Sequence, residues 1–79
     1  MSRYRNITGK QEDFLGKCWN VLNAWYVENK GNATYHQWDV YSEMRFISKV
    51  LNDGSYDLYY DADRLNSLGN LYRYLKLKI

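Results

Sequence analysis

The side chains best suited to nucleophilic chemistry in this sequence are its single cysteine, Cys18, and its single histidine, His36. A cysteine acts as a nucleophile when a nearby base or positive charge lowers its pKa, and a third group usually orients the base. Cys18 instead falls on the apolar stripe of a predicted helix, where a free cysteine packs as a small hydrophobic residue. His36 falls in the first turn of a different predicted helix, and the sequence identifies no third group. We therefore expect no catalytic residue and no enzymatic activity.

A run of oxygen-bearing side chains has the alternating spacing of a calcium loop: Asp53, Ser55, Asp57 and Asp61. An EF-hand also needs glycine at its sixth position and glutamate at its twelfth. Counted from Asp53, those positions hold Leu58 and Arg64, so the pattern fails at both. A closed zinc site needs four Cys or His ligands, and the sequence holds no glycine-rich phosphate loop. We expect neither a metal nor a cofactor.

Aromatic side chains, by contrast, are unusually abundant: 79 residues include nine tyrosines, three tryptophans and two phenylalanines. Each such ring buries about 150–250 Å² and rings dominate both cores and interfaces. A single domain of this size buries only about 60–65% of its unfolded surface. We therefore expect some rings to remain outside the core, where they could contact a second macromolecule.

The single cysteine and the hydropathy of the sequence favour a cytoplasmic location. One cysteine cannot form an intramolecular disulfide, which favours a reducing environment. The first residues lack the apolar segment of a signal peptide, and no apolar stretch approaches the 18–20 residues, roughly, of a membrane span. We expect a cytoplasmic protein with no membrane partner.

Three segments have helical periodicity and a cap residue before them. The first runs from about Gly9 to Asn29, after a capping-box pair at Thr8 and Gln11. Its apolar residues form two adjacent stripes, so this helix is expected to lie centrally and to touch both others. The stripes are Phe14, Cys18, Val21 and Trp25, and Leu15, Trp19, Leu22 and Tyr26.

The second predicted helix runs from about Tyr35 to Leu51, with Thr34 and Gln37 as its capping box. The third runs from about Ala62 toward the C-terminus, with Asp61 as N-cap. These three helices predict a mainly α fold, a small three-helix bundle forming one globular domain over residues 1–79. A tyrosine-rich extended segment, Ser55 to Tyr60, joins the second and third helices.

An α+β fold is the alternative interpretation. Asp53-Gly54 is a two-residue hairpin signal, and the flanking segments 47–51 and 56–60 could pair across it. The alternating residues 75–79 would then form a C-terminal strand. Lys49, however, would lie in the middle of the apolar face of such a hairpin.

One side of the second predicted helix is both aromatic and basic, which favours a binding surface. Tryptophan, tyrosine and arginine are the residue types enriched at binding hot spots. We therefore predict a partner-binding surface in which the rings fill pockets and the cations steer the chain toward an acidic protein. It comprises Tyr35, Trp38, Arg45, Phe46 and Lys49, with Tyr56, Tyr59 and Tyr60 from the tyrosine-rich segment.

Nucleic acid is the second choice of partner. The net charge of +2 is low for a nucleic-acid-binding protein, but every charged residue from Arg64 onward is positive. Arginine and lysine contact phosphates, rings stack on unpaired bases, and asparagine can bind base edges. The predicted residues lie on the outer side of the third helix: Asn66, Asn70, Arg73, Tyr74 and Lys78.

The sequence thus favours a small protein-interaction module that blocks or adapts a larger protein or complex. Small accessory proteins of phages and other mobile elements are an analogy, drawn from size and from the lack of catalytic groups. A homodimer is a further alternative.

Overall fold

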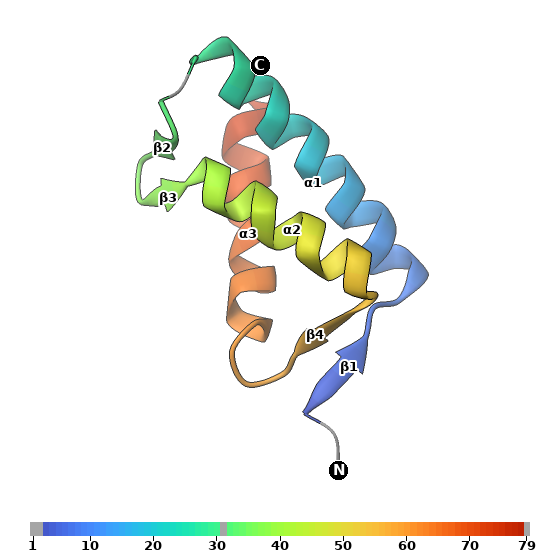
Figure 1. Ribbon diagram of the computed structural model, residues 1–79. Helices are drawn as coiled ribbons and strands as arrows, with labels where there is room; N and C mark the ends of the chain where they lie inside the picture. The colour runs from blue at the N-terminus through green and yellow to red at the C-terminus, as the bar shows by residue number, and fades with distance from the viewer. Residues whose placement is uncertain (1–2, 31, 79) are drawn as a thin grey trace.

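The computed structural model describes residues 3–30 and 32–78, which form three helices and two small antiparallel sheets (Figure 1). The fold is mainly helical, as the sequence predicts. In chain order the elements are β1 (Tyr4–Asn6), α1 (Gly9–Glu28), β2 (Thr34–Tyr35), β3 (Trp38–Asp39), α2 (Val40–Asp53), β4 (Ser55–Asp57) and α3 (Ala62–Lys76). None of the helices in this part of the chain has the length and apolar character that crossing a bilayer requires.

The structure confirms the capping box predicted at the start of helix α1. The Thr8 hydroxyl accepts a hydrogen bond from the Gln11 backbone N–H at 3.1 Å, and the Gln11 side-chain oxygen accepts one from the Thr8 N–H at 2.8 Å. Two backbone N–H groups that a helix start leaves without partners are thereby satisfied. At the other end the Asn29 side chain donates to the Trp25 carbonyl at 2.8 Å. The Trp25 carbonyl also accepts the Asn29 backbone N–H, at 3.0 Å.

Helix α2 begins five residues later than predicted, and the predicted capping box at Thr34 and Gln37 is wrong. The N-cap is Asp39, whose carboxylate accepts from the Ser42 N–H at 3.0 Å. Three residues before Asp39 are β-branched or aromatic types that favour strands: Thr34, Tyr35 and Trp38. They form the β2–β3 hairpin, in which Tyr35 pairs with Trp38 across a turn at His36.

The alternative hairpin at Asp53-Gly54 is also wrong. Gly54 instead ends α2 in the left-handed conformation (φ 70°), and its N–H bonds to the Val50 carbonyl at 2.8 Å. Glycine adopts this conformation without steric penalty, so the same dipeptide serves as a helix C-cap. Strand β4 pairs with β1 from the start of the chain, with Arg5 opposite Tyr56. The extended segment between α2 and α3 is confirmed only over Ser55–Asp57.

Helix α3 begins at Ala62 as predicted, but the Asp61 side chain does not cap it. That carboxylate accepts instead from the Asp57 N–H at 3.1 Å. The alternative C-terminal strand is wrong over residues 75–78, which are helix and turn. Residue 79 lies outside the described residues.

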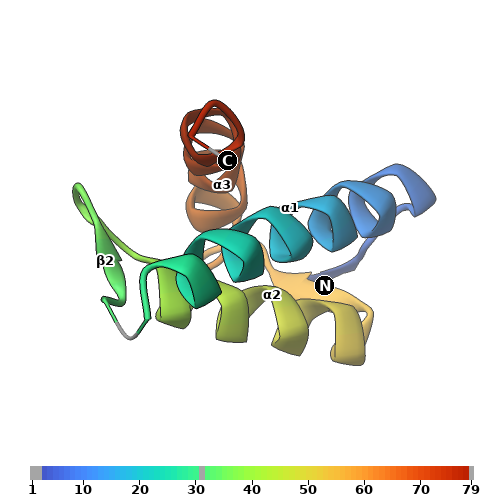
Figure 2. The ribbon, with the colours of Figure 1, turned by 90° about the horizontal axis from the view of Figure 1, so that it is seen from above.

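Helix α1 packs against both other helices, as its two apolar stripes predict. Figure 2 shows α1 and α2 lying side by side, with α3 seen nearly end-on. The core takes an i, i+3, i+7, i+10 face of α1 (Leu15, Cys18, Leu22 and Trp25) together with apolar residues of α2, α3 and β4. The remaining stripe residues of α1 are half-buried around this face.

Candidate functional site

The predicted partner-binding residues do not share one surface. Tyr35 and Trp38 lie on the β2–β3 hairpin and are half-buried, while Arg45 and Lys49 are exposed on α2. Phe46 is buried, with 7% of its surface exposed. The single aromatic and basic face predicted on the second helix is therefore wrong, because that helix starts after Trp38 and turns Phe46 inward.

Phe46 is buried because it belongs to the broad face that α2 turns toward the core, together with Val40, Met44, Ile47 and Val50. The Arg64 guanidinium from α3 lies over the Phe46 ring, 4.5 Å from its centroid. This cation–π contact closes the ring off from solvent on the side toward α3. Phe46 is a core residue that cannot fill a pocket on a partner.

Tyr56 is likewise unavailable, with 8% of its surface exposed. It lies at the centre of β4, and side chains alternate between the two faces of a strand. One face of this strand is turned into the core, where Tyr56 packs with the apolar cluster. Its predicted role in an exposed arm is wrong.

Tyr59 and Tyr60 are the most exposed rings among the described residues, at 78% and 73%. They lie in the turn between β4 and α3. The guanidinium of Arg3, next to β1, is 5.3 Å from the Tyr60 ring centroid and 5.6 Å from that of Tyr4, which is also exposed. We call these four residues the tyrosine tip. It contains two of the eight predicted partner-binding residues.

The tip's backbone is fixed by the buried carboxylate of Asp57. One carboxylate oxygen accepts hydrogen bonds from the Tyr59 and Tyr60 N–H groups, at 2.8 and 3.2 Å. The other is 2.8 Å from the Arg3 side-chain Nε. A hydrogen bond from the Asp61 N–H to the Asp57 carbonyl, also 2.8 Å, closes the turn onto α3. Asp57 thus connects β1, the turn and α3, and its turn resembles the local side-chain-to-backbone turns that aspartate favours.

The charge of Arg3 is reinforced by its neighbours. A side-chain hydrogen bond with Tyr4, followed by attraction to Asp57, raises the pKa of the Arg3 guanidinium. Arg3 therefore remains a permanent cation between two tyrosine rings.

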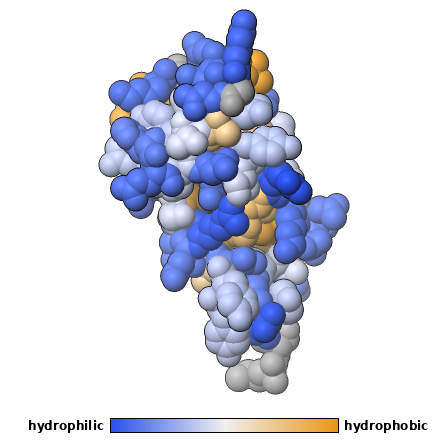
Figure 3. Space-filling view, turned by 60° about the vertical axis from the view of Figure 1, so that its left-hand side comes forward, coloured by the Kyte–Doolittle hydropathy of each residue, from blue (hydrophilic) through white to orange (hydrophobic). Residues whose placement is uncertain are grey.

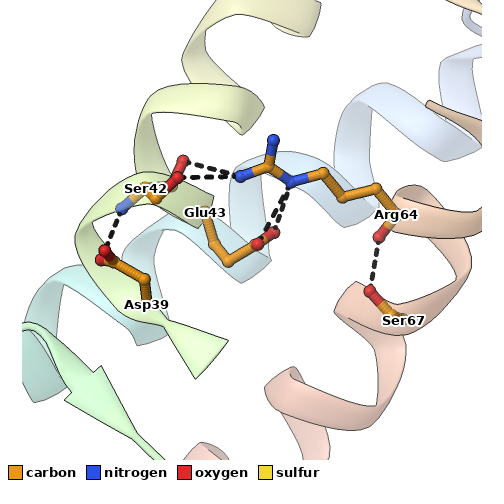
Figure 4. Close-up of polar contacts among 5 residues, drawn as sticks. All are labelled: Asp39, Ser42, Glu43, Arg64 and Ser67. Atoms are coloured by element: carbon orange, nitrogen blue, oxygen red, sulfur yellow. Dashed lines mark hydrogen bonds and ion pairs between the residues drawn. The ribbon is translucent and has the colours of Figure 1, made fainter. Parts of the chain in front are cut away.

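A second polar cluster joins α2 to α3 (Figure 4). The Arg64 Nε is 3.1 Å from a carboxylate oxygen of Glu43, which is 9% exposed, and a terminal nitrogen donates to the Ser42 hydroxyl at 3.0 Å. The hollow beside it is lined by Asp39, Tyr41, Ser42, Arg45, Phe46, Lys49 and Arg64. Arg45 and Lys49 thus lie together as predicted, but without an exposed aromatic ring of Phe46 between them. On the face seen in Figure 3, hydrophobic surface is limited to small areas, one of them near the centre, and polar side chains cover most of the rest.

The five residues predicted as an alternative nucleic-acid surface are all exposed: Asn66, Asn70, Arg73, Tyr74 and Lys78. The first four lie on α3, and Lys78 follows its end. The Arg73 guanidinium donates a hydrogen bond to the Asn70 side chain. Tyr74 contacts the rings of Trp38 and His36, with centroids 6.0 and 6.2 Å apart. The structure therefore brings Asn70, Arg73 and Tyr74 together beside the β2–β3 hairpin.

Cys18 and His36 do not form a nucleophile–base pair. Cys18 is fully buried in the core, and this desolvation raises the pKa of its thiol from 9.0 to about 12. His36 is exposed at the hairpin turn with a φ of 53°. Among the residues that the structure describes, no three His, Cys, Asp or Glu side chains gather closely enough to hold a metal ion.

We expect the Cys18 thiol to resist modification in the folded protein. At about pH 8 a thiol-specific reagent should react with the native chain far more slowly than with the urea-unfolded chain, because the thiolate is the reactive form. Since the folded pKa lies above the unfolded one, the thiol does not affect stability below pH 9.0, and stability falls as pH rises from there toward about 12. Equal labelling rates for native and unfolded protein would contradict this placement.

The sequence prediction missed Arg3 and Tyr4 as parts of the tyrosine tip, and it missed Asp57 as the residue that fixes the tip's backbone. The aspartate two residues before Tyr59 is a local signal that an Asx-type turn could have been predicted from. No local signal pairs Arg3 with that turn, because the contact depends on β1 pairing with β4 across most of the chain. Searches for similarity found no matching protein family, no matching curated protein and no matching solved structure.

Proposed function

We propose that this chain is a small, non-enzymatic protein-interaction module that binds another protein through the tyrosine tip. In this proposal the three helices act as a compact bundle that holds the tip, and the module works in the cytoplasm by blocking or adapting a larger protein. Small accessory factors of phages and mobile elements offer the analogy for that role.

The observation that carries the proposal is the exposure of two adjacent rings on a turn whose backbone is fixed. Single exposed aromatic residues are ordinary on protein surfaces. Here Tyr59, Tyr60 and Arg3 lie together, and tyrosine and arginine are enriched at binding hot spots. Because Asp57 already orders the turn, less conformational entropy is lost when the rings enter a partner.

Arg45 and Lys49 support the choice of an acidic partner. Both are exposed on α2, and within the described residues neither forms an ion pair. Exposed cations of this kind accelerate encounter with an acidic protein more than they strengthen the final complex.

The test is a comparison of tip and control variants in capture and cross-linking from lysate of the source organism. Replacing Tyr59 and Tyr60 by alanine should remove a hot spot and weaken capture of the partner by about 30-fold or more, which corresponds to at least ~2 kcal/mol. The matched control is Tyr41→Ala with Tyr74→Ala, two exposed tyrosines outside the tip, which should leave capture unchanged.

Capture that is equally strong for the wild-type chain and the tip variant would overturn the proposal. Sedimentation of the pure protein at several concentrations determines whether the partner is a second copy of the chain.

A further inference from the structure

The chain after Arg64 carries no acidic residue, so every charged side chain of this C-terminal segment is basic. Its exposed cations are Arg73, Lys76 and Lys78. Cations in a last helical turn complement the helix dipole, and this accounts for Arg73 and Lys76 in α3 without a ligand. Charge alone therefore does not identify a binding surface.

The second observation is the ring cluster beside those cations. Tyr74 is 51% exposed, yet its ring contacts Trp38 and His36 from the β2–β3 hairpin. Tyr35, next to His36 in the hairpin, contacts in turn the core residue Trp25, with ring centroids 5.6 Å apart. The exposed tyrosine is thus supported by a chain of rings that reaches the core, and its position is defined by tertiary structure.

The third observation is a hollow on the same side of α3, whose surface is mostly apolar although a cation and an amide line it. It is lined by Asn70, Arg73, Tyr74 and Leu77. The Asn70 side chain accepts a hydrogen bond from the Arg73 guanidinium, which orients that cation at the hollow. A cation, an amide and a supported aromatic ring therefore meet at one place.

We propose that this surface, formed by the outer side of α3 and the β2–β3 hairpin, binds a single strand of nucleic acid. Exposed cations complement a phosphate backbone, and exposed rings stack on unpaired bases. An unpaired strand fits better than a duplex, since in a duplex the base faces are covered by stacking. This surface shares no residue with the tyrosine tip. The proposal of nucleic-acid binding can therefore be tested independently of the protein-binding proposal.

The first test measures fluorescence anisotropy of a labelled single strand of roughly 20 nucleotides, as DNA and as RNA, beside the corresponding duplex. With two or three phosphates contacted, affinity for the single strand should fall about 20- to 80-fold between about 25 and 200 mM salt. The duplex should bind more weakly. Salt-independent binding, a preference for the duplex, or no binding would overturn the proposal. Equal competition by poly-glutamate would do so too, because it would assign the surface to acidic proteins.

The second test separates the cations from the ring. Arg73→Gln with Lys78→Gln should reduce the slope of log affinity against log salt by about 1.4, since each lost phosphate contact removes about 0.7. Tyr74→Ala should weaken binding by at least about fivefold and leave that slope unchanged, because stacking releases no counterions.

The matched control is Arg45→Gln with Lys49→Gln, which removes the same charge from α2 and should change neither quantity. If the control loses as much affinity as the α3 pair, or if Tyr74→Ala binds like the wild-type chain, the proposed surface is wrong. All substituted residues are exposed, and circular dichroism should show that each variant keeps its helices.

Discussion

Replacing Leu22 by alanine is expected to lower the free energy of unfolding by about 3 kcal/mol. Leu22 is fully buried on the face of α1 that contributes to the core. Its truncation removes apolar burial and leaves a cavity that the surrounding helices fill only in part. A chain of this length has a total stability of roughly 4–12 kcal/mol, so this variant should be close to unfolding at moderate temperature.

Urea denaturation followed by tryptophan fluorescence measures this effect. Val27→Ala is the matched control, because Val27 is on the same helix but 62% exposed. Its stability should stay within about 0.5 kcal/mol of the wild-type value. A loss below about 1 kcal/mol for Leu22→Ala would contradict the central position of α1.

Replacing Arg64 by alanine is expected to cost about 2–3 kcal/mol, the second largest effect. Arg64 is the partner of the nearly buried Glu43 carboxylate, bonds to Ser42 and covers the Phe46 ring. Its removal leaves the Glu43 carboxylate nearly buried and without its cationic partner. The expected cost lies below the roughly 3–5 kcal/mol of a fully buried pair because about a third of the Arg64 side chain is exposed.

A double-mutant comparison tests the cause of that loss. Glu43→Gln added to Arg64→Ala should restore part of the stability, because a neutral amide is less costly to bury than an unpaired carboxylate. Arg45→Ala is the control, since Arg45 is an exposed arginine on α2, two residues after Glu43. The interpretation fails if Arg64→Ala is no more destabilised than Arg45→Ala, or if the added Glu43→Gln lowers stability further.

Both effects bear on the two proposed surfaces. The α2–α3 contact through Arg64 lies near the start of α3, directly after the turn that carries Tyr59 and Tyr60. The α1 core supports the hairpin through Trp25 and Tyr35, and the hairpin supports Tyr74. We therefore expect binding by either surface to be measured reliably only in variants that keep this core intact.

The helices were predictable to the extent that their signals are local. The boundaries of α1 follow from a capping box and apolar spacing within a few residues, and both were confirmed. The start of α2 was misplaced because Thr34 and Asp39 are both good N-caps, and local spacing does not rank them. Pairing of Tyr35 with Trp38 decided between them, and that pairing is stabilised by the contact of Tyr35 with Trp25.

The binding residues were less predictable than the helices. Solvent exposure depends on what packs above a side chain, as the burial of Phe46 under Arg64 and of Tyr56 in β4 shows. By contrast, the exposed positions on α3 were placed correctly, because a single helical stripe determines them.

By itself the sequence determined a mainly helical chain with a central first helix, a ring content larger than the core holds, and a basic C-terminal end. Those properties follow from composition and from spacing over one or two helical turns. Only the tertiary structure decided which rings remain outside, because β1 pairs with β4 and Arg64 reaches across to α2. Both contacts join residues that are far apart in the chain. Local sequence patterns do not predict how strongly such distant residues stabilise one another.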